Sequence, residues 1–398
     1  MKVLFKYSDK LLIILTLAFL TTVLFRIWAN LPAKKAATPI IVLTVWENDL
    51  MAEELKTLIE EFESIHNEIK IDLNAVSYEA LRRDLFDPGE ISSPKDVLML
   101  DLLWVSELLE REIIENTNAP VIKFNNILYY NIDILRETGF SRPPKSRGEF
   151  LSYARTLAGL QEVHPAFSGS LALGLNSSRG IFDDIFPWIW SSGVKLIENG
   201  KPMVNSRPVI ESLSFLAVLN NEGLISRGAF SADSAKKLED FISTRAAFII
   251  APSSEISFVR ECLGDEAFGV TSIPLPDNYS GISFGAAAGR TFAVYSGSAY
   301  KDESRLFLDF LAGEASFLSG RAGLGNGLPF AASSSSDDFY AKVLDITIAS
   351  ELTEEFTGLP WTKLEESFKE ELFALFEGKS SVLETVAEIQ KKWEAILE

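Results

Sequence analysis

The chain has 398 residues and a formal net charge of −19 at neutral pH, with 47% hydrophobic and 23% charged residues. This length exceeds the size at which a single hydrophobic core keeps growing, and the composition is that of a folded protein, so we expect two packed domains. The acidic balance repels phosphate backbones and argues against nucleic-acid binding.

The N-terminal segment has the composition of an export signal. Leu11 to Phe25 is an uncharged apolar run with three lysines before it and Arg26 after it. Lysines on the leading side predict a cytoplasmic N-terminus, so the chain beyond the run is expected outside the cytoplasm, in the periplasm or on the outer face of the membrane. No Ala-x-Ala site follows and Trp28 suits an interface, so we favour an uncleaved membrane anchor over a cleaved signal.

The single cysteine, Cys262, is far from this segment. Its position excludes lipid attachment to an N-terminal cysteine, and its being alone excludes an intrachain disulfide. We expect a buried, unreactive thiol.

Strands and helices alternate in the first part of the exported chain. The apolar patterns predict a parallel α/β sheet wound through helical crossovers. The predicted elements are a strand at Ile40–Val45, a helix carrying Leu55 to Ile65, a strand at Ile69–Leu73, a strand at Val97–Leu100 and a helix at Ser106–Ile114.

The middle and the end of the chain have a different pattern and predict a second lobe and a helical tail. An Asn199-Gly200 pair predicts a hairpin turn within Val194–Val204. A helix after the last predicted strand should turn Leu306, Phe307, Phe310 and Leu311 to one side. The remaining elements are helices at Phe150–Leu160 and Pro208–Asn220, strands at Ala246–Ile250 and Phe292–Tyr295, and a mostly helical tail from Asp337 with an apolar stripe from Val382 to Ile396.

Side chains suited to a sugar follow two predicted strands. Trp46 and Glu47 come directly after the first strand, and Asp101 follows Val97–Leu100, with Trp104 three residues later. Ligands of open parallel sheets bind beyond the carboxyl ends of the strands. A carboxylate accepts hydrogen bonds from hydroxyl pairs while an indole packs on the apolar face of a sugar ring. The alternative is that both tryptophans are core and that Asp101 caps the next helix.

Further on, the pair Trp188 and Trp190 could face a cleft, but helical spacing would place one of them in the core. Catalytic and metal-binding arrangements are not evident. The chain has only His66 and His164, which excludes a His/Cys zinc site and disfavours an imidazole base. Tyr129-Tyr130 resembles a ferric-iron phenolate pair, but nearby partner ligands are not evident. In so acidic a chain the pair Asp183-Asp184 does not support a glycosidase. We therefore predict no enzyme activity, no metal and no cofactor.

Six short motifs, taken in order, resemble the family 1 extracellular solute-binding proteins, relatives of maltose-binding protein. Together they extend over nearly all of the exported part. They are Ile41–Trp46, Pro94–Asp101, Asn126–Asp133 with Gly139, Pro143-Pro144 and Glu149-Phe150 after it, Ala246–Ile250, Ile273–Pro276, and Gly289–Val294 continuing to Phe307–Leu311.

The resemblance implies a two-lobed α/β periplasmic-binding-protein fold of type II with the ligand between the lobes. Hinge crossovers would lie near Ala119–Asn125, Ser283–Gly289 and Gly327–Ala331. Lobe 1 would comprise residues 39–122 and 289–327, and lobe 2 residues 123–288 and 328–398, after an export signal or anchor with linker at 1–38. The candidate ligand-binding residues are Trp46, Glu47, Asp101, Trp104, Tyr130, Trp188, Ser253, Ser254, Gly289 and Arg290.

The implied function is an extracytoplasmic solute-binding protein of an ABC importer, a monomer that delivers its solute to the membrane permease subunits. Sugar is the leading substrate class. Arg290, standing where the family often has an aromatic residue, would favour a carboxylate, phosphate or heavily hydroxylated ligand. The alternatives are a membrane-anchored sensor module and an extracytoplasmic carbohydrate-active enzyme.

Overall fold

The computed structural model describes Thr21 and residues 38–46, 51–87, 95–116, 119, 121–286, 288–314, 342–343, 345–346, 350–353 and 355–398. The chain divides into two compact units, Met1–Pro39 and Ile40–Glu398, and every element described below belongs to the second. Glu47, the predicted crossover at Gly327 to Ala331 and, apart from Thr21, the predicted export segment lie outside the described residues.

The first sheet has five strands and is mixed rather than purely parallel. The central β1 runs parallel to both β2 and β3, as the alternating pattern predicts, whereas β12 enters from late in the chain and pairs antiparallel with β3 and β4. In spatial order the strands are β2 (Lys70–Val76), β1 (Ile40–Trp46), β3 (Val97–Asp101), β12 (Ala288–Val294) and β4 (Ile122–Phe124).

The second sheet begins directly after the first. The chain leaves β4, passes Asn125 and enters β5, within the predicted crossover at Ala119 to Asn125. Here β5 pairs antiparallel with β10 and β9, and β6 pairs parallel with β9. The order is β10 (Phe268–Thr271), β5 (Asn126–Asn131), β9 (Ala246–Pro252) and β6 (Gly169–Ala172).

The described residues also form two small two-stranded sheets. β7 (Ile197–Glu198) and β8 (Lys201–Pro202) form the predicted hairpin, with Asn199 and Gly200 both at positive φ as a tight two-residue turn requires. β11 (Ser283–Ala286) pairs parallel with β13 (Ser350–Thr353).

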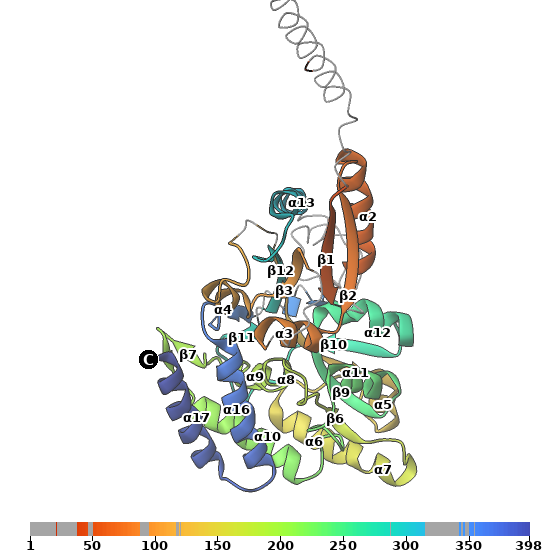
Figure 1. The fold of residues 1–398 in the computed structure, drawn as a ribbon. Helices are drawn as coiled ribbons and strands as arrows, with labels where there is room; N and C mark the ends of the chain where they lie inside the picture. Colours follow the sequence, from red (N-terminus) through yellow and green to blue (C-terminus); the bar gives the residue numbers. More distant parts are fainter. Residues whose placement is uncertain are drawn as a thin grey trace, which may run out of the picture. The chain divides into compact units, whose positions relative to one another are not determined.

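The helices pack against the sheets and against one another (Figure 1). α2 and α13 pack together near the first sheet, where the rings of Phe62 and Phe307 lie 5.0 Å apart between centroids. The last two helices, α16 and α17, lie side by side and pack against α10. The helices are α2 (Met51–Ile65), α3 (Tyr78–Phe86), α4 (Val105–Glu110), α5 (Ile132–Glu137), α6 (Arg147–Ala158), α7 (Leu160–Val163), α8 (Gly180–Asp184), α9 (Phe186–Trp190), α10 (Arg207–Asn221), α11 (Ser234–Ile242), η1 (Ser253–Glu255), α12 (Ile256–Leu263), α13 (Lys301–Gly313), α16 (Trp361–Phe376) and α17 (Val382–Leu397).

Three local expectations are corrected by the structure. The helix predicted to reach Ile114 ends at Glu110, because the chain turns at Glu112, whose φ is positive. Leu306 is exposed, while Phe307 and Leu311 are buried, since neighbouring helix positions point about 100° apart. Cys262 is exposed rather than buried, because α12 turns Ile256 and Val259 to the core instead.

None of the helices in the described part of the chain is long and apolar enough to cross a membrane.

Candidate functional site

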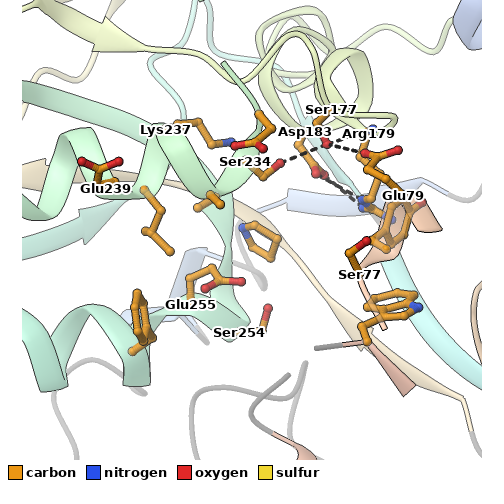
Figure 2. Close-up of a pocket in the computed structure, with 18 of the residues that line it drawn as sticks. Ser77, Glu79, Ser177, Arg179, Asp183, Ser234, Lys237, Glu239, Ser254 and Glu255 are labelled. Carbon is orange, nitrogen blue, oxygen red and sulfur yellow. Dashed lines mark hydrogen bonds and ion pairs between the residues drawn. The ribbon is translucent and has the colours of Figure 1, made fainter. Parts of the chain in front are cut away.

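A cavity of about 660 Å³ opens at the carboxyl ends of strands from both sheets. One wall is formed by Trp46 at the end of β1, by Ser77 to Glu79 at the start of α3, by Phe124 of β4 and by Arg290 of β12. The opposite wall comes from the loop before α8, from α11, from the end of β9 and from α12 (Figure 2). This is the position at which open α/β sheets bind their ligands.

Local sequence explains how α3 reaches the cavity. The side chain of Ser77 accepts a hydrogen bond from the backbone N–H of Ala80 and caps the helix directly after β2 ends at Val76. Because the helix begins at the carboxyl end of a strand, Tyr78 and Glu79 stand at the cavity edge.

Aromatic rings form one corner of the site. Ring centroids of Trp46 and Tyr78 lie 5.0 Å apart, and those of Tyr78 and Trp104 lie 4.6 Å apart. The guanidinium carbon of Arg290 lies 5.0 Å from the Trp46 ring centre and 5.2 Å from that of Phe124, so the charge is held between two aromatic faces.

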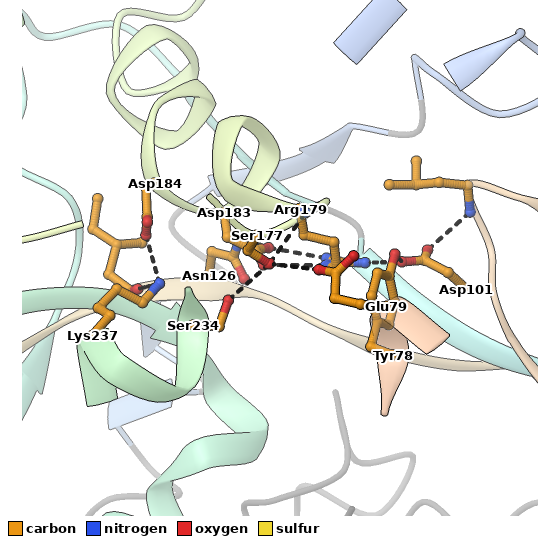
Figure 3. Close-up of polar contacts among 12 residues, drawn as sticks. Tyr78, Glu79, Asp101, Asn126, Ser177, Arg179, Asp183, Asp184, Ser234 and Lys237 are labelled. Carbon is orange, nitrogen blue, oxygen red and sulfur yellow. Dashed lines mark hydrogen bonds and ion pairs between the residues drawn. The ribbon is translucent and has the colours of Figure 1, made fainter. Parts of the chain in front are cut away.

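A buried ion-pair network joins the two sheets beside this corner (Figure 3). Arg179, just before α8, pairs with Asp101 at the end of β3, and its Nη2 lies 3.0 Å from Oδ1 of Asp183. The Tyr78 hydroxyl donates to Asp101 Oδ2 at 2.8 Å, and Asn126 Nδ2 donates to Asp183 Oδ1 at 2.9 Å. The network therefore fixes the start of α3 against α8.

The pKa values of this network follow from burial and pairing. Burial lowers the pKa of Arg179, but the carboxylates of Asp101 and Asp183 outweigh it and hold that pKa well above its usual value. Burial opposes ionisation of Asp183, yet Arg179 keeps its pKa below the usual range. Burial, together with the charge of Asp101, raises the pKa of the Tyr78 phenol. Arg179 and Asp183 are therefore charged at neutral pH, whereas the Tyr78 phenol is neutral.

Two further contacts hold the cavity walls. Glu79 accepts hydrogen bonds from the backbone N–H of Ser178, at 2.8 Å, and from the Ser178 hydroxyl. On α11, Lys237 Nζ donates to Asp184 Oδ1 at 2.6 Å and to the carbonyl oxygen of Ile250 at 2.7 Å. Asp183 and Asp184 are thus both buried, and each is paired with a cation.

Two polar groups on the cavity wall have no hydrogen-bond partner among the described residues. They are the indole Nε1 of Trp46 and the hydroxyl of Ser254, on a side chain only 3% exposed. Native structures rarely leave buried donors unpaired, so each such group calls for a partner. Two residues of the cavity wall therefore each carry a buried polar group that still needs a partner.

Among the residues predicted from sequence, Trp46, Ser254 and Arg290 lie on the cavity wall. Asp101 and Trp104 lie directly behind that wall, Asp101 in the ion-pair network and Trp104 under Tyr78. Asp101 also accepts a hydrogen bond from the Leu103 N–H, but the predicted alternative that it caps the next helix is wrong, because α4 begins at Val105 with Trp104 at its N-cap and no side-chain capping bond.

Four other candidates do not line the cavity. Trp188 is fully buried between Phe150 and Phe215, at centroid distances of 5.0 and 5.2 Å. The other three candidates, Tyr130, Ser253 and Gly289, make packing or backbone contacts instead. The Tyr130 ring covers Gly269, the Ser253 N–H donates to Asn125 O at 2.8 Å, and Gly289 O accepts from the Leu102 N–H at 3.1 Å.

Sequence reasoning missed Tyr78, Glu79, Arg179, Asp183 and Lys237. The first two follow the carboxyl end of β2, the same signal that identified Trp46, so they could have been found by extending it to every strand. Arg179 and Lys237 gain their role from partners distant in the chain. No local pattern encodes such a contact.

The family model of the bacterial extracellular solute-binding proteins matches residues 48–316, more than half of the chain. A "Probable ABC transporter-binding protein" of Deinococcus radiodurans is 27% identical over a match that covers 36% of this chain. The match spans only 40% of the length of that relative.

Solved structures share the fold at low sequence identity. A solute-binding protein of Thermotoga lettingae aligns with a TM-score of 0.76 at 14% identity, covering 90% of this chain and all of that one. The GacH receptor of Streptomyces glaucescens gives 0.74 at 15% identity, with 90% and 98% covered. MalE3 of T. maritima gives 0.70 at 17% identity, with 89% and 99% covered.

The two-sheet α/β architecture is thus the two-lobed fold of periplasmic binding proteins. From the match over residues 48–316, the chain belongs to the bacterial extracellular solute-binding protein family, whose members bind solutes outside the cytoplasm.

Proposed function

We propose that this protein is the solute-capturing subunit of an ABC importer and that its solute is a sugar or a sugar derivative. The observation that carries the proposal is a pair of buried, unpaired polar groups, Trp46 Nε1 and Ser254 Oγ, on two residues of a cavity wall that also carries aromatic rings. A sugar presents hydroxyl groups on its edge and C–H groups on its faces. It can therefore satisfy the polar groups and pack on the rings at once.

Energetics favour a hydroxylated ligand over an apolar one at these two groups. A buried donor left without a partner costs about 1–3 kcal/mol. A solute hydroxyl that accepts from the indole and exchanges a hydrogen bond with Ser254 recovers that free energy on binding.

The ligands named for the fold relatives give the screen its starting point. The structures of the T. lettingae, S. glaucescens and T. maritima proteins are described with alpha-D-tagatose, with acarbose and with maltose. These ligands belong to those proteins. Because the likeness extends only to the fold, we use them as the first compounds to test.

The remaining parts of the proposal concern partners and location. A monomer would release its solute unaltered to the permease subunits of the importer. Leu11 to Phe25 would hold it at the outer face of the cytoplasmic membrane. Fractionation of cells that express the full chain tests the anchor: the protein should stay with the membrane after a salt wash, and recovery in the soluble fraction would contradict anchoring.

A thermal-shift screen of the exported chain against saccharides, polyols, amino acids and oligopeptides tests the function. A ligand that binds only the folded state raises the melting temperature, by an amount that grows with its concentration over Kd. We expect a shift within the saccharide or polyol group. Shifts confined to amino acids or peptides, or absent throughout, would refute the carbohydrate proposal.

Two tryptophan variants then locate the site. Trp46 lies on the cavity wall, whereas Trp188 is sealed in the core between phenylalanines. We predict that the ligand-induced change in tryptophan fluorescence is lost in Trp46→Phe, with weaker binding because the Nε1 donor is gone. The matched variant Trp188→Phe should keep both the fluorescence change and the affinity; the opposite pattern would place the ligand at Trp188.

A further inference from the structure

The wall of the cavity opposite the aromatic corner carries two groups of apolar side chains beside its polar residues. On α11, Ala235, Leu238 and Ile242 recur at helical spacing and all line the cavity. On α12, Phe258 and Cys262 do the same. Residues three, four or seven apart lie on one face of a helix, so each helix presents a stripe of side chains to the same space.

These side chains lie outside the fully buried core, although Leu238 packs against its second cluster. Each helix has its own core-facing side, with Phe241 of α11 and Val259 of α12 both fully buried. Leu238 and Ile242 are only partly buried, and Phe258 is 38% exposed. An apolar stripe in addition to the core face is unusual, and clustered apolar groups that remain accessible mark binding surfaces.

Charges set a limit on what this wall can accept. Glu239 and Glu255 flank the apolar stripes and also line the cavity. Glu239 is engaged by Lys236, at 3.2 Å, and by Arg245, so its charge is held at the edge of α11. A carboxylate-bearing chain such as a fatty acid would be repelled here, whereas an uncharged apolar group would not.

The two chemically different walls belong to one continuous cavity. Its volume of about 660 Å³ lies within the range of roughly 300–1,000 Å³ typical of pockets for drug-sized ligands. Trp46, Ser254 and Arg290 provide polar and aromatic contacts, and the stripes of α11 and α12 provide apolar contacts.

We propose that the solute is amphipathic, with a hydroxylated part at Trp46 and Ser254 and an uncharged apolar substituent between α11 and α12. This inference rests on the proposed function and narrows its substrate class to sugars that carry an alkyl or aromatic group. The apolar stripes would bind that substituent by excluding water from both surfaces.

The first experiment compares matched glycosides on the full exported chain. Methyl and phenyl glycosides of glucose, galactose and mannose differ only in the substituent. For any sugar that binds, we expect the phenyl glycoside to bind about tenfold or more tightly, because its ring buries apolar area. Methyl glycosides that bind as tightly as phenyl glycosides would overturn the apolar site and leave the proposed function intact.

The second experiment tests the apolar wall without a sugar. N-phenyl-1-naphthylamine, an uncharged dye that fluoresces in apolar surroundings, should bind the protein and be displaced by phenyl glycosides. The variants Leu238→Asn with Ile242→Asn, and separately Phe258→Ser, should each weaken dye binding about tenfold or more. Leu383→Asn, at an exposed leucine of α17, is the matched control and should bind the dye like the unchanged protein.

The outcomes separate the two claims. Unchanged dye binding in both wall variants, with melting temperatures showing folded proteins, would overturn the apolar site. Two variants on different helices guard against a folding defect in either one. If the dye binds through this wall while no glycoside of either kind binds, the apolar site is supported and the carbohydrate proposal fails.

Discussion

Arg290 is the residue whose role the structure changes most. Its guanidinium lies between the rings of Trp46 and Phe124, so it sets the spacing of the aromatic corner as well as adding charge. We predict that Arg290→Ala raises the Kd for the solute about tenfold while the protein stays folded. Titration calorimetry and the melting temperature check the two parts.

Arg290→Lys is the informative comparison at this position. Lysine keeps the charge but not the planar group that stacks on two rings. If stacking matters, Arg290→Lys should bind nearly as weakly as Arg290→Ala. Full affinity in the alanine variant would remove Arg290 from the site.

Glu355 is a residue through which pH should act on stability. Its carboxyl accepts hydrogen bonds from Trp190 Nε1 at 2.5 Å and from the Ile197 N–H at 2.9 Å. Burial outweighs these bonds and raises its pKa to about 7, from an ordinary value of 4.5. Between these pH values the folded protein binds more protons at this site than the unfolded chain, so its contribution to stability falls as pH rises from about 4.5 through 7.

We therefore predict that Glu355→Gln, which resembles the protonated acid, flattens the loss of stability over this window. The substitution should reduce the slope of the unfolding free energy against pH by at most about 1.4 kcal/mol per pH unit. Urea unfolding at pH 5 and pH 8 measures it. Glu222→Gln is the control, because Arg155 lowers the pKa of Glu222 and that contribution is not lost as pH rises. Equal slopes in the native protein and Glu355→Gln would show that this carboxyl does not titrate in the window.

At the scale of elements, the Arg179 network is what joins α3 and β3 to α8. Removing the cation leaves Asp101 and Asp183 buried without a counter-charge. We predict that Arg179→Gln lowers the free energy of unfolding by about 3–5 kcal/mol. Urea denaturation measures this change. Arg155→Gln breaks an exposed pair with Glu222 and should change stability little; a similarly small effect at Arg179 would mean that the network is dispensable.

The strands were predictable because burial on both faces leaves a direct mark in the sequence. Val97 to Leu100 is a continuous apolar run and is fully buried in β3. The Asn199-Gly200 turn was equally clear, since few residues adopt its positive φ values. Short helices such as α3 were missed, because nine residues with only Leu81 and Leu85 buried give little periodicity.

The antiparallel entry of β12 into the first sheet could not be predicted from local pattern. Its apolar residues Phe292 to Val294 indicate a buried strand but not its neighbours or direction. The same limit applies to the cavity: Trp46 was identified from its place after a strand, while Trp188 has the same residue type and lies in the core. Which tryptophan faces a ligand depends on contacts between distant segments.

At the scale of the whole molecule, charge should select the solute. The chain carries a net charge of −19, and the cavity wall itself has more carboxylates than cations. Arg179 and Lys237 are already paired with buried carboxylates. The carboxylates on the wall are Glu79, Asp183, Asp233, Glu239 and Glu255, and the cations are Arg179, Lys237 and Arg290.

We predict that a neutral sugar binds about tenfold or more tightly than its uronic acid or phosphate ester, because the anion enters a field of like charge. Calorimetry with each pair at low and high salt measures the difference, which should shrink as salt screens the charges. Tighter binding of the anion would show that Arg290 acts as an anion ligand instead.

A crystal structure of the exported chain with the solute found by screening tests the central claim most directly. We predict electron density for the solute in the cavity between the two sheets. Its hydroxyl oxygens should lie about 2.7–3.2 Å from Trp46 Nε1 and Ser254 Oγ. A solute bound elsewhere on the protein, with this cavity empty, would contradict the account.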